Sequence, residues 1–146
     1  MRALIQRVNH AKVSIKGQTF SRIEKGFLVL LGITHTDTEA DIDFLVEKIA
    51  NLRVFGDEND KMNLSLLDIK GEVLIVSQFT LYADCKRGRR PDFIDAAKPE
   101  LANELYKKFI QRFKVTGLQV REGEFGAMMD IELVNSGPVT ILLDSK

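Results

Sequence analysis

The chain has 146 residues, and its 21 basic and 21 acidic side chains give a formal net charge of zero. Hydrophobic residues make up 45% and charged residues 29%, a composition typical of a globular domain and not of a disordered or membrane chain. With no net charge there is no overall field to attract nucleic acid, so an anionic partner must bind a local patch. We expect one domain over residues 1–146.

The sequence also bears on the compartment. No apolar run approaches the roughly 20 residues needed to cross a bilayer, and the first 15 residues alternate apolar and polar side chains, unlike a signal peptide. Cys85 is the single cysteine, so no intramolecular disulfide can form and a reducing compartment is favoured. We therefore expect a cytoplasmic protein with no membrane partner.

The first part of the chain reads as strands. Side chains from Arg2 to Ile15 alternate as in a half-buried strand pair, and Lys16 to Gln18 supplies a turn before "TFSRI". This pattern predicts an antiparallel meander. The continuous apolar run "FLVLLGI" that follows Gly26 is typical of a strand buried on both faces, so we expect it at the centre of the sheet.

Two segments have helical periodicity. Apolar residues recur at helical spacing from about Thr38 to Leu52, and Thr36 with Glu39 fits the capping-box pattern. A second amphipathic helix is predicted from Pro99 to near Gly117. Between the helices, "EVLIVSQFTLY" predicts one long strand over residues 72–82.

Three further strand candidates follow the second helix. They are "LQVRE", "MMDIELVN" and "VTILLD", separated by Gly123 to Gly126 and by the turn formers Ser136 to Pro138. With about seven strands and two helices that do not alternate regularly, the sequence predicts an α+β fold with a mostly antiparallel, curved, barrel-like sheet.

Most common catalytic constellations are absent. There is no glycine-rich phosphate loop, and His10 and His35 stand far apart with no cysteine pair, so we expect no metal and no cofactor. The sequence places no base beside Cys85, so a buried or incidental thiol is favoured over a nucleophile.

Two stretches carry polar groups in otherwise apolar surroundings. In "SQFTLYAD", Ser77, Gln78 and Thr80 interrupt an apolar strand; they fit either strand-end residues or a site, and Thr80 as a nucleophile lacks an evident base. "NSGPVT" contains the Gly137-Pro138 step and by itself fits a tight hairpin turn.

Between them lies the strongest local positive patch, "CKRGRRPD". Such a run is either a solvated loop or a phosphate contact next to a site at the end of the preceding strand. Its basic residues are Lys86, Arg87, Arg89 and Arg90.

Together, "SQFTLYAD" and "NSGPVT" resemble the two signature motifs of D-aminoacyl-tRNA deacylases. "MRALIQRV", "DKMNLSL", "GRRPDF" and "GEFGAMMDIELVNSGPVT" also follow that family's order and spacing, so the resemblance covers nearly the whole chain. It implies an enzyme that hydrolyses the ester of D-aminoacyl-tRNA at the acceptor 3′ end. The same enzyme would also hydrolyse the ester of glycine mischarged on tRNA(Ala). The resemblance further implies a barrel-like homodimer whose active site is shared between subunits.

The same resemblance implies the roles of individual residues. Gly137 and Pro138, joined by a cis bond, would enter the partner's active site and exclude L side chains. The backbone N–H groups of Phe79 and Thr80 would stabilise the oxyanion, Ser77 and Gln78 would orient the ester, and the 2′-hydroxyl of the terminal adenosine would assist catalysis. The implied supporting residues are Arg7, which would brace the Gly-Pro segment, and the pocket residues Phe125, Ala127 and Met129.

Two other interpretations remain open. The chain could be a non-enzymatic nucleic-acid-binding module that uses the "KRGRR" loop, although its neutral net charge disfavours strong non-specific binding. It could also be a small-molecule hydrolase with Thr80 as nucleophile.

Overall fold

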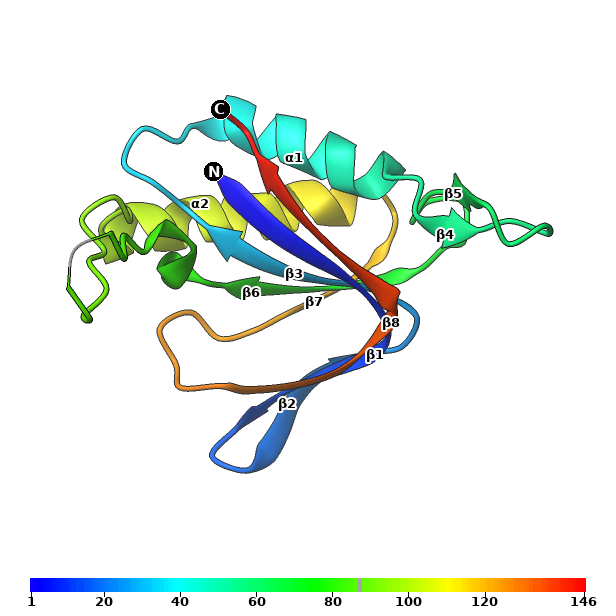
Figure 1. Ribbon diagram of the computed structural model, residues 1–146, viewed down its shortest axis with the longest axis horizontal. Helices are drawn as coiled ribbons and strands as arrows, with labels where there is room; N and C mark the ends of the chain where they lie inside the picture. Colours follow the sequence, from blue (N-terminus) through cyan, green and yellow to red (C-terminus); the bar gives the residue numbers. More distant parts are fainter. Residues whose placement is uncertain (87) are drawn as a thin grey trace.

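The computed structural model describes residues 1–86 and 88–146. Two helices cover one face of a curved six-stranded sheet, and a second part of that sheet curls beneath the other face (Figure 1). The elements in chain order are β1 (Arg2–Ile15), β2 (Gln18–Ile23), β3 (Gly26–Gly32), α1 (Glu39–Asn51), β4 (Phe55–Gly56), β5 (Met62–Leu64), β6 (Glu72–Ser77), the 3-10 turn η1 (Phe79–Tyr82), α2 (Pro99–Val115), β7 (Gln119–Glu122) and β8 (Asp130–Asp144).

Strand β1 organises the sheet because it pairs with three other strands. Its first half, Arg2 to Val8, pairs antiparallel with β3, and its second half, Ala11 to Ile15, pairs with β2. Its other edge pairs with β8 from Arg2 to Ser14. The predicted strand pair within residues 2–15 was therefore wrong: the alternating pattern belongs to one long strand, and β2 and β3 share β1 instead of forming a meander.

Strand β3 lies at the centre of the sheet, as its apolar run predicted. It pairs antiparallel with β1 and parallel with β6, and β6 pairs parallel with β7. Parallel neighbours need crossover connections, which α1 and α2 supply. The sheet is thus mixed, with three antiparallel and two parallel pairs, and the prediction of a mostly antiparallel, barrel-like α+β fold is confirmed.

Two apolar clusters fill the two sides of the sheet. The larger lies between the sheet and the helices, where the rings of Phe27 and Phe55 have centroids 5.0 Å apart. The smaller is enclosed where β1, β2 and β8 curl under the central strands (Figure 1). Its fully buried members are Val8, Ala11, Val13, Ile23, Leu28, Leu74 and Val76.

Both helices lie close to their predicted positions. Helix α1 has Thr38 as its N-cap, but its capping box joins Thr38 to Asp41 and not Thr36 to Glu39, because the helix begins after Thr38. Helix α2 begins at Pro99, whose missing N–H needs no partner in a first turn. Within residues 1–86 and 88–146, neither helix is long and apolar enough to cross a membrane.

The two signature segments differ from the predicted strands. The strand predicted over residues 72–82 ends at Ser77, and the chain then turns through η1. "MMDIELVN" and "VTILLD" belong to the single strand β8, so the hairpin turn expected at "NSGPVT" is wrong. Asn135 pairs with Val8 and Thr140 with Gln6, which leaves residues 136–139 as a bulge opposite one residue of β1.

Candidate active site

The end of β6 presents the first polar group of residues. Ser77 is the last residue of the strand, and the Gln78 backbone N–H donates to the Leu31 carbonyl at 2.8 Å, which keeps Gln78 attached to the sheet. The Gln78 side-chain amide donates to the Thr80 hydroxyl. The apolar strand thereby ends in a short, fixed polar turn.

The backbone N–H groups of Phe79 and Thr80 lie at the start of η1. The first N–H groups of a helical turn have no acceptor within the turn. In the part of the chain that the structure describes, no other group accepts from these two amides either. They are therefore available as two neighbouring donors for a ligand oxygen.

A mainly apolar cavity of about 700 Å³ opens beside this turn. Phe125, Ala127 and Met129, which come from the loop between β7 and β8, line it together with Ser77, Gln78 and Phe79. Other lining residues that the sequence did not indicate are Phe93, Ala96, Ala97, Lys98, Pro99 and Ala102. The amphipathic pattern of α2 marks its core face but not which residues line a cavity near its first turn.

Aromatic and hydrogen-bond contacts hold the cavity walls. The exposed ring of Phe79 meets Phe93 edge to face, with centroids 5.0 Å apart. Behind the lining residue Phe125, whose ring centroid lies 5.9 Å from that of Tyr106, the buried Tyr106 hydroxyl donates to the Ile75 carbonyl at 2.8 Å and to the Gly123 carbonyl at 3.1 Å. Burial raises the pKa of Tyr106 above its ordinary value, which further favours the protonated hydroxyl that donates these two hydrogen bonds.

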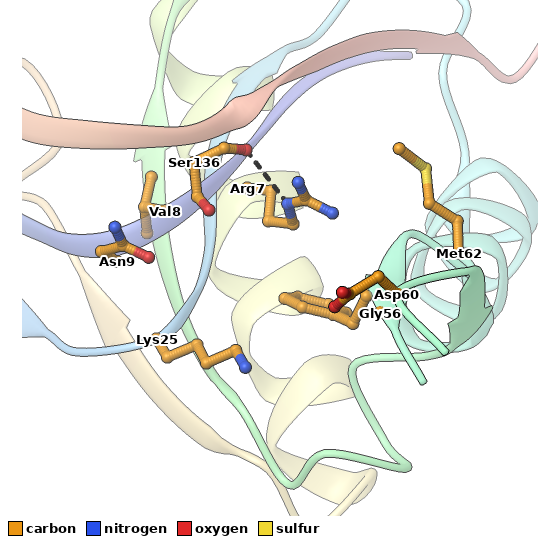
Figure 2. Close-up of a pocket in the computed structure, with 9 residues that line it drawn as sticks. Arg7, Val8, Asn9, Lys25, Gly56, Asp60, Met62 and Ser136 are labelled. Carbon is orange, nitrogen blue, oxygen red and sulfur yellow. Dashed lines mark hydrogen bonds between the residues drawn. The ribbon is translucent and has the colours of Figure 1, made fainter. Parts of the chain in front are cut away.

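The Gly137-Pro138 segment lies in the exposed bulge of β8, and its peptide bond is cis. Arg7 contacts the bulge from β1: its Nε donates to the Ser136 carbonyl at 3.0 Å (Figure 2), and its Nη1 donates to the Val54 carbonyl. Arg7 and Ser136 also line a second cavity of about 320 Å³, into which Lys25 and Asp60 point (Figure 2).

Side chains at the base of the bulge fix its shape. The Asn135 side chain donates to the Thr140 hydroxyl at 2.8 Å and accepts from the Val139 backbone N–H at 3.1 Å. Residues Gly137 and Pro138 themselves are exposed. The exposed corner at Gly137 and Pro138 is thereby held in place by side-chain contacts at the base of the bulge.

The two signature motifs do not share a cavity within one chain. Among the described residues, the cavity beside Ser77 is lined without Gly137 or Pro138, and without Arg7. The family resemblance implies a site shared between two subunits; in the single chain, the structure has a cavity at the end of β6 and an exposed corner on β8.

The basic loop after η1 is exposed. Asp84 and Asp92 exchange two backbone hydrogen bonds, of 2.8 and 2.9 Å, across the base of this loop. Lys86, Arg89 and Arg90 are exposed within it, while Arg87 lies outside the described residues. In the described part of the chain, no three His, Cys, Asp or Glu side chains gather in a way that could hold a metal ion.

Comparison with known proteins agrees with this geometry. The profile of the family described as D-Tyr-tRNA(Tyr) deacylase matches residues 4–144. The D-aminoacyl-tRNA deacylase of Thermosipho africanus (strain TCF52B) is 60% identical over 146 residues, which cover 100% of this chain and 98% of that protein. That of Clostridioides difficile (strain 630) is 59% identical over 145 residues, covering 99% and 97%. The chain belongs to the D-Tyr-tRNA(Tyr) deacylase family.

Solved structures share the fold over the whole chain. One titled c-Myc DNA Unwinding Element Binding Protein superposes with a TM-score of 0.94 at 42% identity, covering 100% of this chain and 99% of that one. A probable eukaryotic D-amino acid tRNA deacylase has a TM-score of 0.84 at 17% identity, with 97% of each chain covered, and so shares the fold.

Proposed function

We propose that this protein hydrolyses the ester bond of D-aminoacyl-tRNA and releases the D-amino acid and free tRNA. The observation that carries the proposal is the pair of free backbone N–H groups of Phe79 and Thr80 beside an apolar cavity. The proposal is also supported by relatives that are about 60% identical over nearly their full length and are named D-aminoacyl-tRNA deacylases.

In this proposal the terminal adenosine and its ester enter the cavity at the end of β6. The Phe79 and Thr80 amides stabilise the oxyanion that forms when water attacks the ester carbonyl. Ser77 and Gln78 orient the ribose or the ester oxygen, and Phe125, Ala127 and Met129 line the pocket. No protein base is assigned, so the 2′-hydroxyl of the terminal adenosine assists the attacking water.

Selection against L-amino acids is assigned to the carbonyl groups of Gly137 and Pro138. If the ester and the α-amino group are fixed, changing chirality exchanges the hydrogen and the side chain on Cα. A rigid backbone placed where the L side chain would lie excludes it by overlap, whatever its chemistry. Because glycine has no side chain to exclude, glycyl-tRNA, including glycine mischarged on tRNA(Ala), is also a substrate in this proposal.

This mechanism requires a homodimer. Within one chain, the described lining of the cavity lacks Gly137 and Pro138, and these residues are exposed on β8. We infer that the bulge of one subunit enters the cavity of its partner and completes the site. Arg7 supports the bulge through Ser136. A monomeric protein that is fully active would contradict this inference.

The basic loop supplies the remaining tRNA contact in this account. Lys86, Arg87, Arg89 and Arg90 follow η1 in the sequence, where phosphates near the 3′ end would pass. A local patch of this kind suits a chain with zero net charge, because it attracts an anion without non-specific binding over the whole surface. Such an enzyme acts in the cytoplasm, where aminoacyl-tRNA is used.

The proposed function is tested by incubating the protein with D-tyrosyl-tRNA and measuring release of D-tyrosine. Turnover of many substrate molecules per subunit is expected. Intact ester after incubation with folded protein would overturn the proposal.

A second candidate is a nucleic-acid-binding module without enzymatic activity. The observation that favours it is the 42% identical solved relative whose title names DNA-unwinding-element binding. A salt titration of RNA and duplex DNA binding separates the two: a module holds nucleic acid without turnover, and its affinity falls steeply with salt. A third, a small-ester hydrolase with Thr80 as nucleophile, predicts turnover of simple esters and loss of all activity in Thr80→Ala.

A further inference from the structure

Arg2 joins the start of β1 to the turn that carries the candidate oxyanion donors. Its Nη1 donates to the Leu81 carbonyl at 3.0 Å, and its guanidinium carbon lies 4.5 Å from the centre of the Tyr82 ring. Its Nε donates to the Asp144 carboxylate at 2.9 Å. Figure 1 shows the start of β1 beside the end of β8, where Asp144 lies. One side chain therefore connects η1 to two strands.

The turn η1 depends on contacts of this kind. It has only four residues, and such a short helical segment has little stability of its own. Gly32 of β3 lies directly beneath it: a Cβ at Gly32 would come within 3.0 Å of the Leu81 Cβ and 3.2 Å of the Gln78 carbonyl oxygen. The turn thus packs against the backbone of Gly32, and Arg2 binds the C-terminal end of the turn through the Leu81 carbonyl.

The contact with Leu81 also satisfies a backbone group. The last carbonyl groups of a helical turn have no donor within it, and a cationic side chain placed there is favourable. Arg2 supplies both the donor and the charge, while Asp144 holds the guanidinium in place.

We propose that Arg2 is a positioning residue for ester hydrolysis, which holds η1 so that the Phe79 and Thr80 amides point at the developing oxyanion. This inference rests on the proposed function. Arg2 does not line the cavity and acts through Leu81 and Tyr82. Displacement of the donors by a fraction of an ångström weakens stabilisation of the transition state more than binding of the substrate.

The residue has to be arginine for a geometric reason. Its planar guanidinium donates in two directions and stacks on the Tyr82 ring at the same time, whereas a lysine ammonium is a point charge on a flexible stem. Arg2→Lys therefore keeps the positive charge but loses the simultaneous contacts with Asp144, Leu81 and the Tyr82 ring. A matched control is Arg22→Gln on β2, which removes an exposed pair with Glu24 at 2.9 Å.

The test compares Arg2→Gln, Arg2→Lys and Arg22→Gln with the wild type. Hydrolysis of D-tyrosyl-tRNA gives kcat and KM, thermal unfolding reports folding, and NMR records the Phe79 and Thr80 amide signals. We expect Arg2→Gln to lower kcat about tenfold with KM within about twofold, Arg2→Lys to recover part of the loss, and both to shift the two amide signals. Arg22→Gln should change none of these.

Two results would overturn the inference. The first is an Arg2→Lys or Arg2→Gln protein that turns over at the wild-type kcat. The second is a lower kcat with unmoved Phe79 and Thr80 signals, because the effect would then not pass through η1. If the wild type leaves D-tyrosyl-tRNA intact, the proposed function fails, while the NMR comparison still decides whether Arg2 holds the turn.

Discussion

The Arg7 guanidinium occupies the space that a side chain at position 137 would need. A Cβ added to Gly137 would lie 2.5 Å from Arg7 Nη2. Gly137 also has φ of +121°, a conformation that residues with a side chain rarely adopt. The position of Arg7, which contacts Ser136, therefore requires glycine at position 137.

Gly137→Ala is therefore expected to lower the free energy of unfolding by about 1–3 kcal/mol. It should also reduce D-tyrosyl-tRNA hydrolysis by about tenfold or more, because it displaces the segment that contacts the substrate in the proposed mechanism. Urea unfolding and single-turnover hydrolysis measure the two effects. Gly17→Ala is the matched control, since Gly17 has φ of +77° but nothing within 4 Å of its would-be Cβ. Equal effects of the two substitutions on hydrolysis would contradict the account.

Thr80→Ala should keep D-tyrosyl-tRNA hydrolysis within about tenfold of the wild type, because only the backbone of Thr80 is assigned to the oxyanion. The substitution removes an exposed hydroxyl that accepts from Gln78. The paired substrate change is a tRNA ending in 2′-deoxyadenosine, which should not be turned over. An inactive Thr80→Ala protein that is folded would point to a hydroxyl nucleophile.

Tyr106→Phe should lower the free energy of unfolding by about 1–2 kcal/mol, because it removes a buried donor shared by the Ile75 and Gly123 carbonyl groups. Hydrogen exchange of the Gly123 amide, which donates to Ile75 at 2.9 Å, should also become faster. Tyr82→Phe is the control: in the described part of the chain, the Tyr82 hydroxyl makes no hydrogen bond. Similar losses from both would show that the Tyr106 hydroxyl contributes nothing specific.

The Arg2–Asp144 pair predicts a pH dependence of stability. Burial raises the pKa of Asp144, but the hydrogen bond from Arg2 and further favourable contacts lower it more, so the net pKa lies below its ordinary value of 3.8. The stabilisation is then present above pH 3.8 and is lost as the pH falls through the lower folded-state value. Asp144→Asn should melt below the wild type at neutral pH, with the difference shrinking as the pH falls below 3.8 and through the lower folded-state pKa of Asp144. A difference that grows on acidification would be inconsistent with the pair.

Much of the fold could be predicted from periodicity. The run "FLVLLGI" identified the central strand, and Pro99 marked the start of α2. The pattern failed where tertiary contacts decide the outcome. Residues 79–82 have high strand propensity. They turn nonetheless, because the pairing of β6 with β3 ends at Ser77 and the chain after it packs onto Gly32 at the end of β3.

The candidate site was only partly predictable for a related reason. The polar residues of "SQFTLYAD" stand out because they interrupt an apolar strand, but Ala102 and Lys98 carry no such signal, since only the packing of α2 places them at the cavity. "NSGPVT" reads as a hairpin turn because its residues favour turns. The pairing of Asn135 and Thr140 with β1 makes it a bulge instead, and no local rule contains that long-range register.

The measurement that tests the central claim most directly is hydrolysis of matched D-tyrosyl-tRNA and L-tyrosyl-tRNA by the wild type and by Pro138→Ala. Rapid loss of the D ester alone, with the difference between the two esters reduced in the variant, is the result predicted for stereochemical selection by the Gly137-Pro138 corner. Equal hydrolysis of both esters by the wild type, or unchanged selectivity in a folded Pro138→Ala protein, would contradict it.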